Sequence, residues 1–428
     1  MNKVAFVWHM NLNASLLPRP KVITYATKWI PAMLATAKVP QNISSMGEDW
    51  LVLQRIAPDL ITQIKEDDQI GILNGTFSHG LFAGFRDLQG VQATYPGMNM
   101  PAIRSAFFKV RQAQLSLGDY IHRKIFGNKL AGVGMIPEFD LTSLEIDQIK
   151  QYWELSILKQ TVNRFQDSDR TPIDLSPGLA EVLNVDSSAT LPCLITNDTY
   201  NQAFHQFYLG KIKPTDLVRS ITEYSGSQPQ VIVMDLDGLF LNRTSDDPET
   251  DPGFEAWQEF QKALAQSSLD IMTISTLLEE TQAGKFTAQG EYFAGPRDYS
   301  KWQVPYYDEQ VIAQALALIT ADDPYQKLLV LSNMTSDRYS AITKDPKTEI
   351  SEFGTAKKQI RFNQVGFIHT DFYVREQALI NRTTIAKTIE QIDQILNGTF
   401  STEQKYFLLA LDASIKELAS AQYSILPG

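Results

Sequence analysis

The sequence is poor in cysteine, which excludes whole classes of protein. Its 428 residues contain a single cysteine, Cys193. One cysteine allows no internal disulfide framework and no cysteine-rich metal site, and it is what a reducing cytosol permits. We therefore expect Cys193 to be a core thiol in a cytoplasmic protein.

Positive charge is also scarce. Lys and Arg total 38 against 49 for Asp and Glu, which gives a formal net charge of -11. A protein that binds the phosphate backbone needs a concentration of basic residues, and the sequence offers no such footprint. Nucleic acid is therefore not an expected partner.

Long apolar runs are absent as well. No stretch approaches the roughly 20 apolar residues of a membrane span, so no membrane partner is expected. At the N-terminus, Lys3 precedes only the short apolar run 4–8, and Asn11 and Asn13 follow at once. This pattern is typical of a buried first strand rather than a signal peptide.

What the sequence does contain is an alternation of short apolar runs with longer amphipathic stretches. The runs are residues 4–8, 69–73, 130–136 and 230–234. Such alternation is typical of parallel strands covered by helices, so the sequence predicts an α/β fold. Between the first two runs, residues 50–65 have apolar residues at helical spacing, and Pro58 indicates an early-turn position or a kink. We expect one crossover helix there.

The composition changes near residue 285. Residues 284–305 are rich in Gly, Pro and aromatic residues, and the apolar periodicity beyond them is helical. The sequence therefore predicts two units, an α/β domain over residues 1–285 and a mainly helical C-terminal domain over residues 286–428.

Two histidines stand at the ends of predicted strands. His9 closes the first apolar run, and His79 follows the second, after Asn74-Gly75-Thr76-Phe77-Ser78. In α/β barrels this end of the strands carries the active site. The two side chains are candidates for binding a hydroxylated ligand or a metal, or else are hydrogen-bonded loop residues. Because no His-x-x-x-His partner completes a zinc site, no metal or cofactor is predicted.

A carboxylate follows the third run. Gly132-Val133-Gly134-Met135-Ile136-Pro137-Glu138 ends an apolar strand with glycines and a proline, a layout that holds Glu138 at the strand terminus with backbone packed close by. The alternative is that Glu138 opens a helix, where an acid favours the positive end of the dipole.

Two more carboxylates, Asp235 and Asp237, follow the fourth run. Residues two apart on a strand emerge on the same side, and two anions at the end of a buried strand are costly unless something uses or neutralises them. Glycoside hydrolysis, phosphoryl transfer and cation binding in a turn are the competing functions. The structural alternative is a solvated Asp-Leu-Asp-Gly turn.

In their order along the chain, these segments resemble family 57 of the glycoside hydrolases. Trp8-His9-Met10-Asn11 takes the place of the family's His-Gln-Pro opening, and residues 69–81 resemble its second motif. Gly134-Met135-Ile136-Pro137-Glu138 resembles the third motif and Asp235-Leu236-Asp237 the fourth. Together these matches are more specific than any one of them.

The resemblance implies an incomplete (β/α)7 barrel followed by helices, and a retaining mechanism on α-linked glucans. Glu138 would be the nucleophile and Asp235 the general acid and base, with their carboxyl groups about 5 to 5.5 Å apart. Trp302 is the expected platform for a sugar ring. The expected substrate-binding residues are His9, His79, Asp237 and Trp302. The expected partner is an α-glucan or oligosaccharide.

Three positions depart from the family's pattern. Met10-Asn11 replaces Gln-Pro in the first motif, Gly71 stands where a glutamate is expected, and Met135 stands where a tryptophan is expected. These changes remove a carboxylate and a flat stacking surface that help bind a glucosyl unit. A catalytically weak or inactive relative that binds a glycan is therefore the second hypothesis.

The segment from Val231 to Gly238 also resembles the first motif of the haloacid-dehalogenase phosphatases, and residues 328–333 resemble their second. In that alternative Asp235 would accept the phosphoryl group, Asp237 would be the general acid, and magnesium would bridge the carboxylates and phosphate. Leu239 stands where Thr or Val is expected. This alternative leaves the residues before Val231 without a role.

Overall fold

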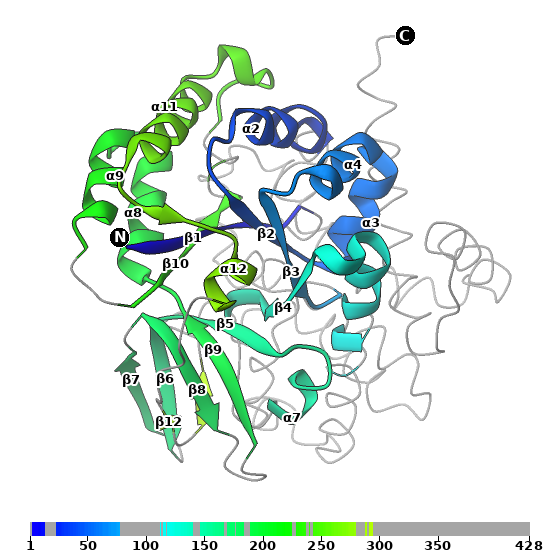
Figure 1. Cartoon of the computed structure of the whole chain (residues 1–428), viewed down its shortest axis with the longest axis vertical. Coiled ribbons are helices and arrows are strands. Elements are labelled where there is room, and N and C mark those ends of the chain that lie inside the picture. The colour runs from blue at the N-terminus through cyan, green and yellow to red at the C-terminus, as the bar shows by residue number, and fades with distance from the viewer. Residues whose placement is uncertain are drawn as a thin grey trace, which may run out of the picture.

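The computed structural model in Figure 1 describes a little over half of the chain. The described residues are 2–12, 23–77, 112, 114–116, 118–139, 146–166, 169–175, 177–183, 189–224, 228–236, 239, 243–279, 287–288 and 291–293. The mainly helical domain predicted for residues 286–428 lies outside them, except for the short pieces at 287–288 and 291–293.

Seven parallel strands lie side by side in the described part of the chain, in the order β10-β1-β2-β3-β4-β5-β9. They are β1 (Lys3–Met10), β2 (Gln41–Ser45), β3 (Ile70–Gly75), β4 (Leu130–Met135), β5 (Leu155–Leu158), β9 (Thr190–Ile195) and β10 (Gln230–Asp235). The four runs predicted as strands are confirmed as β1, β3, β4 and β10, and the α/β class with a mainly parallel sheet is confirmed with them.

The two ends of this series meet. A parallel bridge joins Thr196, just after β9, to Val231 of β10, and the Asn197 N–H donates to the Val231 carbonyl oxygen at 3.0 Å. The sheet therefore curves round until β9, the last strand of the series, approaches β10, the first.

Side chains alternate between the two faces of the curved sheet, as they do along any strand. On β1, Ala5 and Val7 belong to an inner apolar cluster that also holds Val231 and Val233 of β10. The residues between them, such as Phe6, belong to an outer cluster shared with the helices. The described residues thus form one core inside the curve of the sheet, one between the sheet and the helices, and a third that contains Trp153 and Cys193. Cys193 of β9 is fully buried, as predicted, and burial raises the pKa of its thiol.

Helices cover the outer face of the sheet (Figure 1). They are η1 (Tyr25–Trp29), α2 (Ile30–Thr36), α3 (Gly47–Ile56), α4 (Pro58–Glu66), α8 (Asp198–Tyr208), α9 (Pro214–Thr222) and α11 (Pro252–Gln266). Two short helices pack elsewhere: α12 (Ile274–Glu279) against the inner cluster, and α7 (Ile146–Ile149) in a separate cluster with Trp153 and Cys193. Among the described residues, none of the helices has the length and apolar character that crossing a membrane demands.

The single helix expected over residues 50–65 is wrong, because the segment forms two helices. Helix α3 ends at Ile56 and α4 begins at Pro58, with Ala57 between them at φ -146° and ψ 59°. Proline has no N–H to donate to the preceding turn, but it fits the first position of a new helix. Pro58 therefore starts α4, the early-turn position that its sequence indicated.

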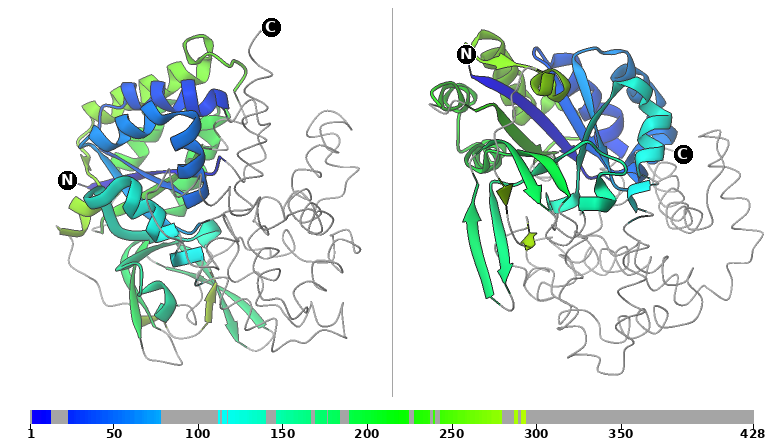
Figure 2. Two further views of the ribbon diagram at one scale, coloured as in Figure 1. Left: turned by 90° about the vertical axis from the view of Figure 1, so that its right-hand side faces the viewer. Right: turned by 60° about the horizontal axis from the view of Figure 1, so that its bottom comes forward.

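Between β5 and β9 along the chain, the described residues form three antiparallel strands that were not predicted from the sequence. Strands β6 (Thr161–Gln166) and β7 (Asp169–Asp174) form a hairpin, and β8 (Gly178–Leu183) pairs with β9. Figure 2 shows these strands extending away from the helices. Two short strands past residue 285 join them, since β12 (Thr287–Ala288) pairs with β8 and β13 (Glu291–Phe293) pairs with β6.

A buried histidine connects β2, α3 and the helical residues 118–126. His122, in the helical residues 118–126, is fully buried, and its Nδ1 lies 2.7 Å from the Gly118 carbonyl oxygen. The Trp50 indole N–H of α3 donates to His122 Nε2 at 3.0 Å, and the Ser45 carbonyl oxygen of β2 lies 3.0 Å from the same nitrogen. Burial lowers the pKa of His122 despite these two carbonyls. The ring is therefore neutral, with Nδ1–H donating to Gly118 and Nε2 accepting from Trp50.

This burial predicts a pH-dependent loss of stability. The pKa of His122 in the folded state lies below its unfolded value of about 6.5, so the unfolded state binds more protons below that pH. The contribution is present above about pH 6.5 and is lost as the pH falls from there through the lower pKa of the folded state. We expect His122→Gln to lose less unfolding free energy than the parent between pH 7 and pH 5, measured by urea denaturation. An equal loss in the parent and in His122→Gln would contradict the assignment.

Candidate functional site

A pocket of about 430 Å³ lies at the carboxyl ends of the parallel strands. Its walls come from β1, β4, β10 and α8 and from single residues that follow β1, β4 and β5. The lining residues are His9, Asn11, Met135, Phe139, Lys159, Asp198, Asn201, Gln202, His205, Gln206, Tyr208, Val233 and Asp235. Carboxylate, imidazole, ammonium, amide and phenol groups thus converge above the apolar inner core, whose residues Met135 and Val233 form part of the floor.

Two of the residues predicted from the sequence lie side by side in this pocket. His9 and Asp235 are paired in register on the neighbouring strands β1 and β10, which places their backbones about 4.8 Å apart. Each is two residues beyond an inner-core valine, Val7 and Val233, so both side chains leave the strands on the inner face. His9 is 9% exposed, whereas Asp235 is exposed.

The backbone of Glu138 enters the same region. Glu138 is the middle residue of the 3-10 turn η4 (Pro137–Phe139), and the pocket residues Met135 and Phe139 lie on either side of it in the chain. Glu138 therefore does not open an α-helix, which was the alternative drawn from the sequence. Phe139 has φ 57°, a left-handed conformation that costs a non-glycine residue about 1–2 kcal/mol. Such strain is typical of functional sites.

A tight contact fixes the strand that leads to Glu138. A Cβ atom on Gly134 would lie 2.0 Å from Cδ2 of Trp153, whose indole ring is 1% exposed. Only glycine lets β4 pass this close to the ring. The glycine seen in the sequence before Glu138 is thus explained by packing against Trp153. Trp29, Trp50 and Trp257 are also buried in the core.

Helix α8 forms the wall that the sequence analysis missed. It runs in the same direction as β10, because Asn197 bonds to Val231 and the Asn201 side-chain oxygen accepts from the Val233 N–H at 2.9 Å. The helix therefore supplies a hydrogen-bond partner to the edge of β10 beyond Val231, where none of the described strands pairs with it. A polar stripe at positions 198, 201, 202 and 205 faces the pocket, opposite the aromatic residues of the core. This helical spacing was visible in the sequence.

An ion pair buried beside the pocket holds the segment that follows Asp235. Arg243 and Asp251 form a salt bridge at 3.2 Å, with side chains 6% and 3% exposed. Arg243 also donates to the carbonyl oxygens of Leu239 and of Tyr208, at 3.0 and 3.1 Å. One guanidinium thus connects the residues after β10, the end of α8 and the start of α11.

Asp251 completes this arrangement as the N-cap of α11. It accepts hydrogen bonds from the backbone N–H groups of Gly253, Thr244 and Ser245 at 2.8, 2.9 and 3.1 Å. Burial alone would raise the pKa of Asp251, but these donors and Arg243 outweigh it, so the pKa lies below its ordinary value. Asp251 is therefore ionised, and the pair is charged on both sides.

The departures from the family pattern also have a structural counterpart. A Cβ atom on Gly71 would lie 2.4 Å from Oδ1 of Asn42, so the Asn42 amide fills the space where a longer side chain would begin. Asn42 accepts from the Ile274 N–H at 2.8 Å and donates to the Phe6 carbonyl oxygen at 2.9 Å. Met135 gives the pocket a flexible apolar side chain at the position where the motif resemblance implies a tryptophan.

The remaining predicted residues, His79, Asp237 and Trp302, lie outside the described residues. Within the part of the chain that is described, no cluster of three or more His, Cys, Asp or Glu side chains is arranged to hold a metal ion.

Comparisons with known proteins find similarity in structure only. No protein-family model and no curated protein sequence matches the chain. An exo-type maltose-forming amylase from Pyrococcus sp. ST04 has a TM-score of 0.50 and 8% identity, over 95% of this chain and 82% of that one. A 4-α-glucanotransferase from Thermococcus litoralis has a TM-score of 0.48 and 14% identity, over 100% of this chain and 61% of that one. The α-amylase AmyC from Thermotoga maritima has a TM-score of 0.48 and 11% identity, over 97% and 98%.

At these identities the similarity establishes the fold alone, and the maltose-forming amylase is the comparison on which the fold argument rests. The chain spans about three fifths of the length of the glucanotransferase. The fold and the pocket together define an α/β protein with a curved parallel sheet and a polar cavity at the carboxyl ends of its strands.

The contact at Gly134 predicts a large effect of adding one methyl group. Gly134→Ala should lower the free energy of unfolding by about 3 kcal/mol, because the methyl group overlaps the Trp153 ring and forces strand or ring to move. In a Trp153→Leu background the same substitution should have a much smaller effect, since the overlapping atoms are gone. Urea denaturation of the four proteins measures both values. An equal loss in the two backgrounds would show that the ring is not the cause.

Proposed function

We propose that this chain is a retaining enzyme that acts on α-linked glucans, either by hydrolysis or by transfer to an acceptor sugar. The observation that carries the proposal is the pocket at the strand ends, where Asp235 lies next to His9 and where Met135 and Phe139 flank Glu138 in the chain. The fold shared with the maltose-forming amylase and the ordered motif resemblance support it.

In this proposal the seven parallel strands are the incomplete (β/α)7 barrel implied by the motifs. The bridge between Thr196 and Val231 supports a closed, barrel-like path for the sheet, and α8 takes the place of a further strand beside β10. In barrels of this kind the working residues lie at the carboxyl ends of the strands. Asp235 is the last residue of β10, and Glu138 follows β4 by three residues.

The chemistry uses both carboxyl groups in each step of a double displacement. Glu138 attacks the anomeric carbon while protonated Asp235 gives its proton to the leaving glycosidic oxygen, and a covalent glycosyl ester forms. Asp235, now a carboxylate, takes a proton from water or from an acceptor hydroxyl as that oxygen attacks the same carbon. Two inversions give retention of the α configuration.

Binding groups surround these two residues. His9 is placed to exchange a hydrogen bond with a sugar hydroxyl beside Asp235, and the polar stripe of α8 adds amide groups suited to the same task. His79, Asp237 and Trp302 are proposed as further substrate contacts on the motif resemblance, with Trp302 stacking on a pyranose ring.

A glycan-binding protein without turnover is the second candidate. Two observations favour it, the Asn42 amide in the space next to Gly71 and the apolar Met135 in the pocket wall. Both reduce the groups available to orient a glucosyl unit. The phosphatase alternative has less support. It gives no role to the residues before Val231, yet β1 lies in that segment and pairs directly with β10, which carries Asp235.

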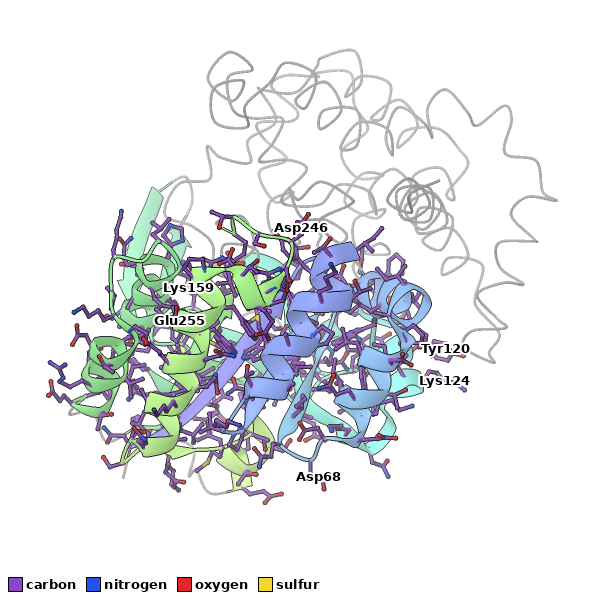
Figure 3. The ribbon with its side chains drawn as sticks, turned by 90° about the horizontal axis from the view of Figure 1, so that it is seen from above. Asp68, Tyr120, Lys124, Lys159, Asp246 and Glu255 are labelled. Carbon is purple, nitrogen blue, oxygen red and sulfur yellow. The ribbon has the colours of Figure 1, made fainter. Side chains whose placement is uncertain are left out.

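The direct test is turnover of maltooligosaccharides by the parent and by two isosteric variants. Glu138→Gln and Asp235→Asn should each lower kcat by about 10³-fold, because each removes a group used in the bond-breaking step. Glu255→Gln is the matched control, since Glu255 is an exposed acid on the outer helix α11 (Figure 3), and it should retain full activity. Product analysis by NMR of the first-formed anomer reports retention.

Each alternative has its own outcome. Equal activity in Glu138→Gln and the parent would remove Glu138 from the mechanism. Affinity for maltooligosaccharides with no turnover in the parent would favour the binding protein. Magnesium-dependent release of an aryl phosphate, abolished in Asp235→Asn, would favour the phosphatase.

A further inference from the structure

One polar group in the pocket wall has no role in the proposed chemistry and no hydrogen-bond partner among the described residues. Tyr208, the last residue of α8, is 5% exposed and lines the pocket. Within the described part of the chain its buried hydroxyl makes no hydrogen bond. A hydroxyl removed from water without compensation destabilises the fold, so its retention calls for an explanation other than stability.

The register of α8 against β10 brings this hydroxyl to the level of Asp235. The hydrogen bond between Asn201 and the Val233 N–H fixes a common starting point. From there Asp235 lies about 6.6 Å further along the strand, and the Cα of Tyr208 lies about 10.5 Å further along the helix. A helical side chain leans back toward the N-terminus, so the long tyrosine ring returns toward the height of Asp235.

The ring is also held firmly. Its centroid lies 6.2 Å from that of Phe204 and 5.9 Å from that of Phe207, and the Tyr208 carbonyl oxygen accepts from Arg243, which Asp251 fixes in turn. A phenol fixed in this way loses little freedom when it forms a hydrogen bond, so it is suited to hold another group in place.

We propose that Tyr208 is a positioning residue for Asp235, whose carboxylate accepts a hydrogen bond from the Tyr208 hydroxyl once Asp235 has given up its proton. This inference rests on the proposed role of Asp235 as general acid and base. The Asp235 proton goes to the leaving oxygen, Tyr208 keeps its own proton throughout, and the proton from water or the acceptor returns to Asp235. The hydrogen bond stabilises the charged form of Asp235 and holds the oxygen that receives the returning proton.

The electrostatic surroundings agree with a phenol that acts only as a donor. Burial raises the pKa of Tyr208 well above its ordinary value, and the charge of Asp235 raises it further, against a smaller lowering by Arg243. The hydroxyl therefore stays protonated at any pH at which the protein works.

Other titratable groups line the same pocket or lie close enough to act on Tyr208. They are His9 from β1, Lys159 after β5, Asp198 and His205 from α8, and Arg243 after β10. Because these groups are the same in the parent and in Tyr208→Phe, the difference between the two proteins isolates the hydroxyl.

The test is the pKa of Asp235, measured in the full chain by NMR titration of 13Cγ-labelled aspartate, with Asp235→Asn identifying the signal. In Tyr208→Phe the pKa of Asp235 should rise by about one pH unit, because the carboxylate loses a hydrogen bond. The temperature of unfolding should stay the same or rise, since the substitution removes a buried hydroxyl that makes no hydrogen bond within the described part of the chain. This measurement needs no turnover, so it can fail independently of the proposed function.

Tyr200→Phe on the same helix is the matched control. The Tyr200 hydroxyl donates to the Ser220 carbonyl oxygen at 2.7 Å, so its loss should lower the unfolding temperature and leave the pKa of Asp235 unchanged. Where maltooligosaccharides are turned over, the basic limb of the pH–rate profile should move upward in Tyr208→Phe alone. An unchanged Asp235 pKa in Tyr208→Phe, or a loss of stability like that of Tyr200→Phe, would overturn the proposal.

Discussion

The hydrogen bonds between α8 and the free edge of β10 are the constraint on which the site depends. The bridge between Thr196 and Val231 is followed by further residues of β10, including Val233. The buried N–H of Val233 needs an acceptor, because a buried N–H without one is costly. Asn201 provides that acceptor for Val233. By closing the sheet with a helix in place of another strand, the protein gains a pocket wall of side chains, and the same contact sets the height of Tyr208 relative to Asp235.

The pocket also depends on a rigid frame outside it. Trp153 leaves room only for glycine at position 134, which fixes the path of β4 before the strained turn at Phe139. On the opposite side the buried pair of Arg243 and Asp251 ties the residues after β10 to two helices. A buried ion pair is weak evidence for stability, since desolvation offsets much of the attraction. Its value here is geometric, because several backbone groups converge on it.

Some of the fold and site was predictable from the sequence and some was not. Continuous apolar runs marked β1, β3, β4 and β10, and the rule that parallel strands end at one edge placed His9 and Asp235 at the same end of the sheet. Their pairing was not predictable, because it depends on β10 lying next to β1 across more than two hundred residues. Helix α8 was missed because its polar face looks like a solvated surface until β10 is placed beside it. The hairpin of β6 and β7 was missed for another reason, because neither strand contains a continuous apolar run.

The central claim is that Glu138 and Asp235 act together on an α-glucosyl unit in this pocket. Trapping of the covalent intermediate tests it most directly, by incubating the chain with a fluorinated α-maltosyl fluoride and mapping the adduct by peptide mass spectrometry. The account predicts one glycosyl adduct, on the peptide that contains Glu138, and none in Glu138→Gln. An adduct on another carboxylate, or no adduct at all, would contradict it.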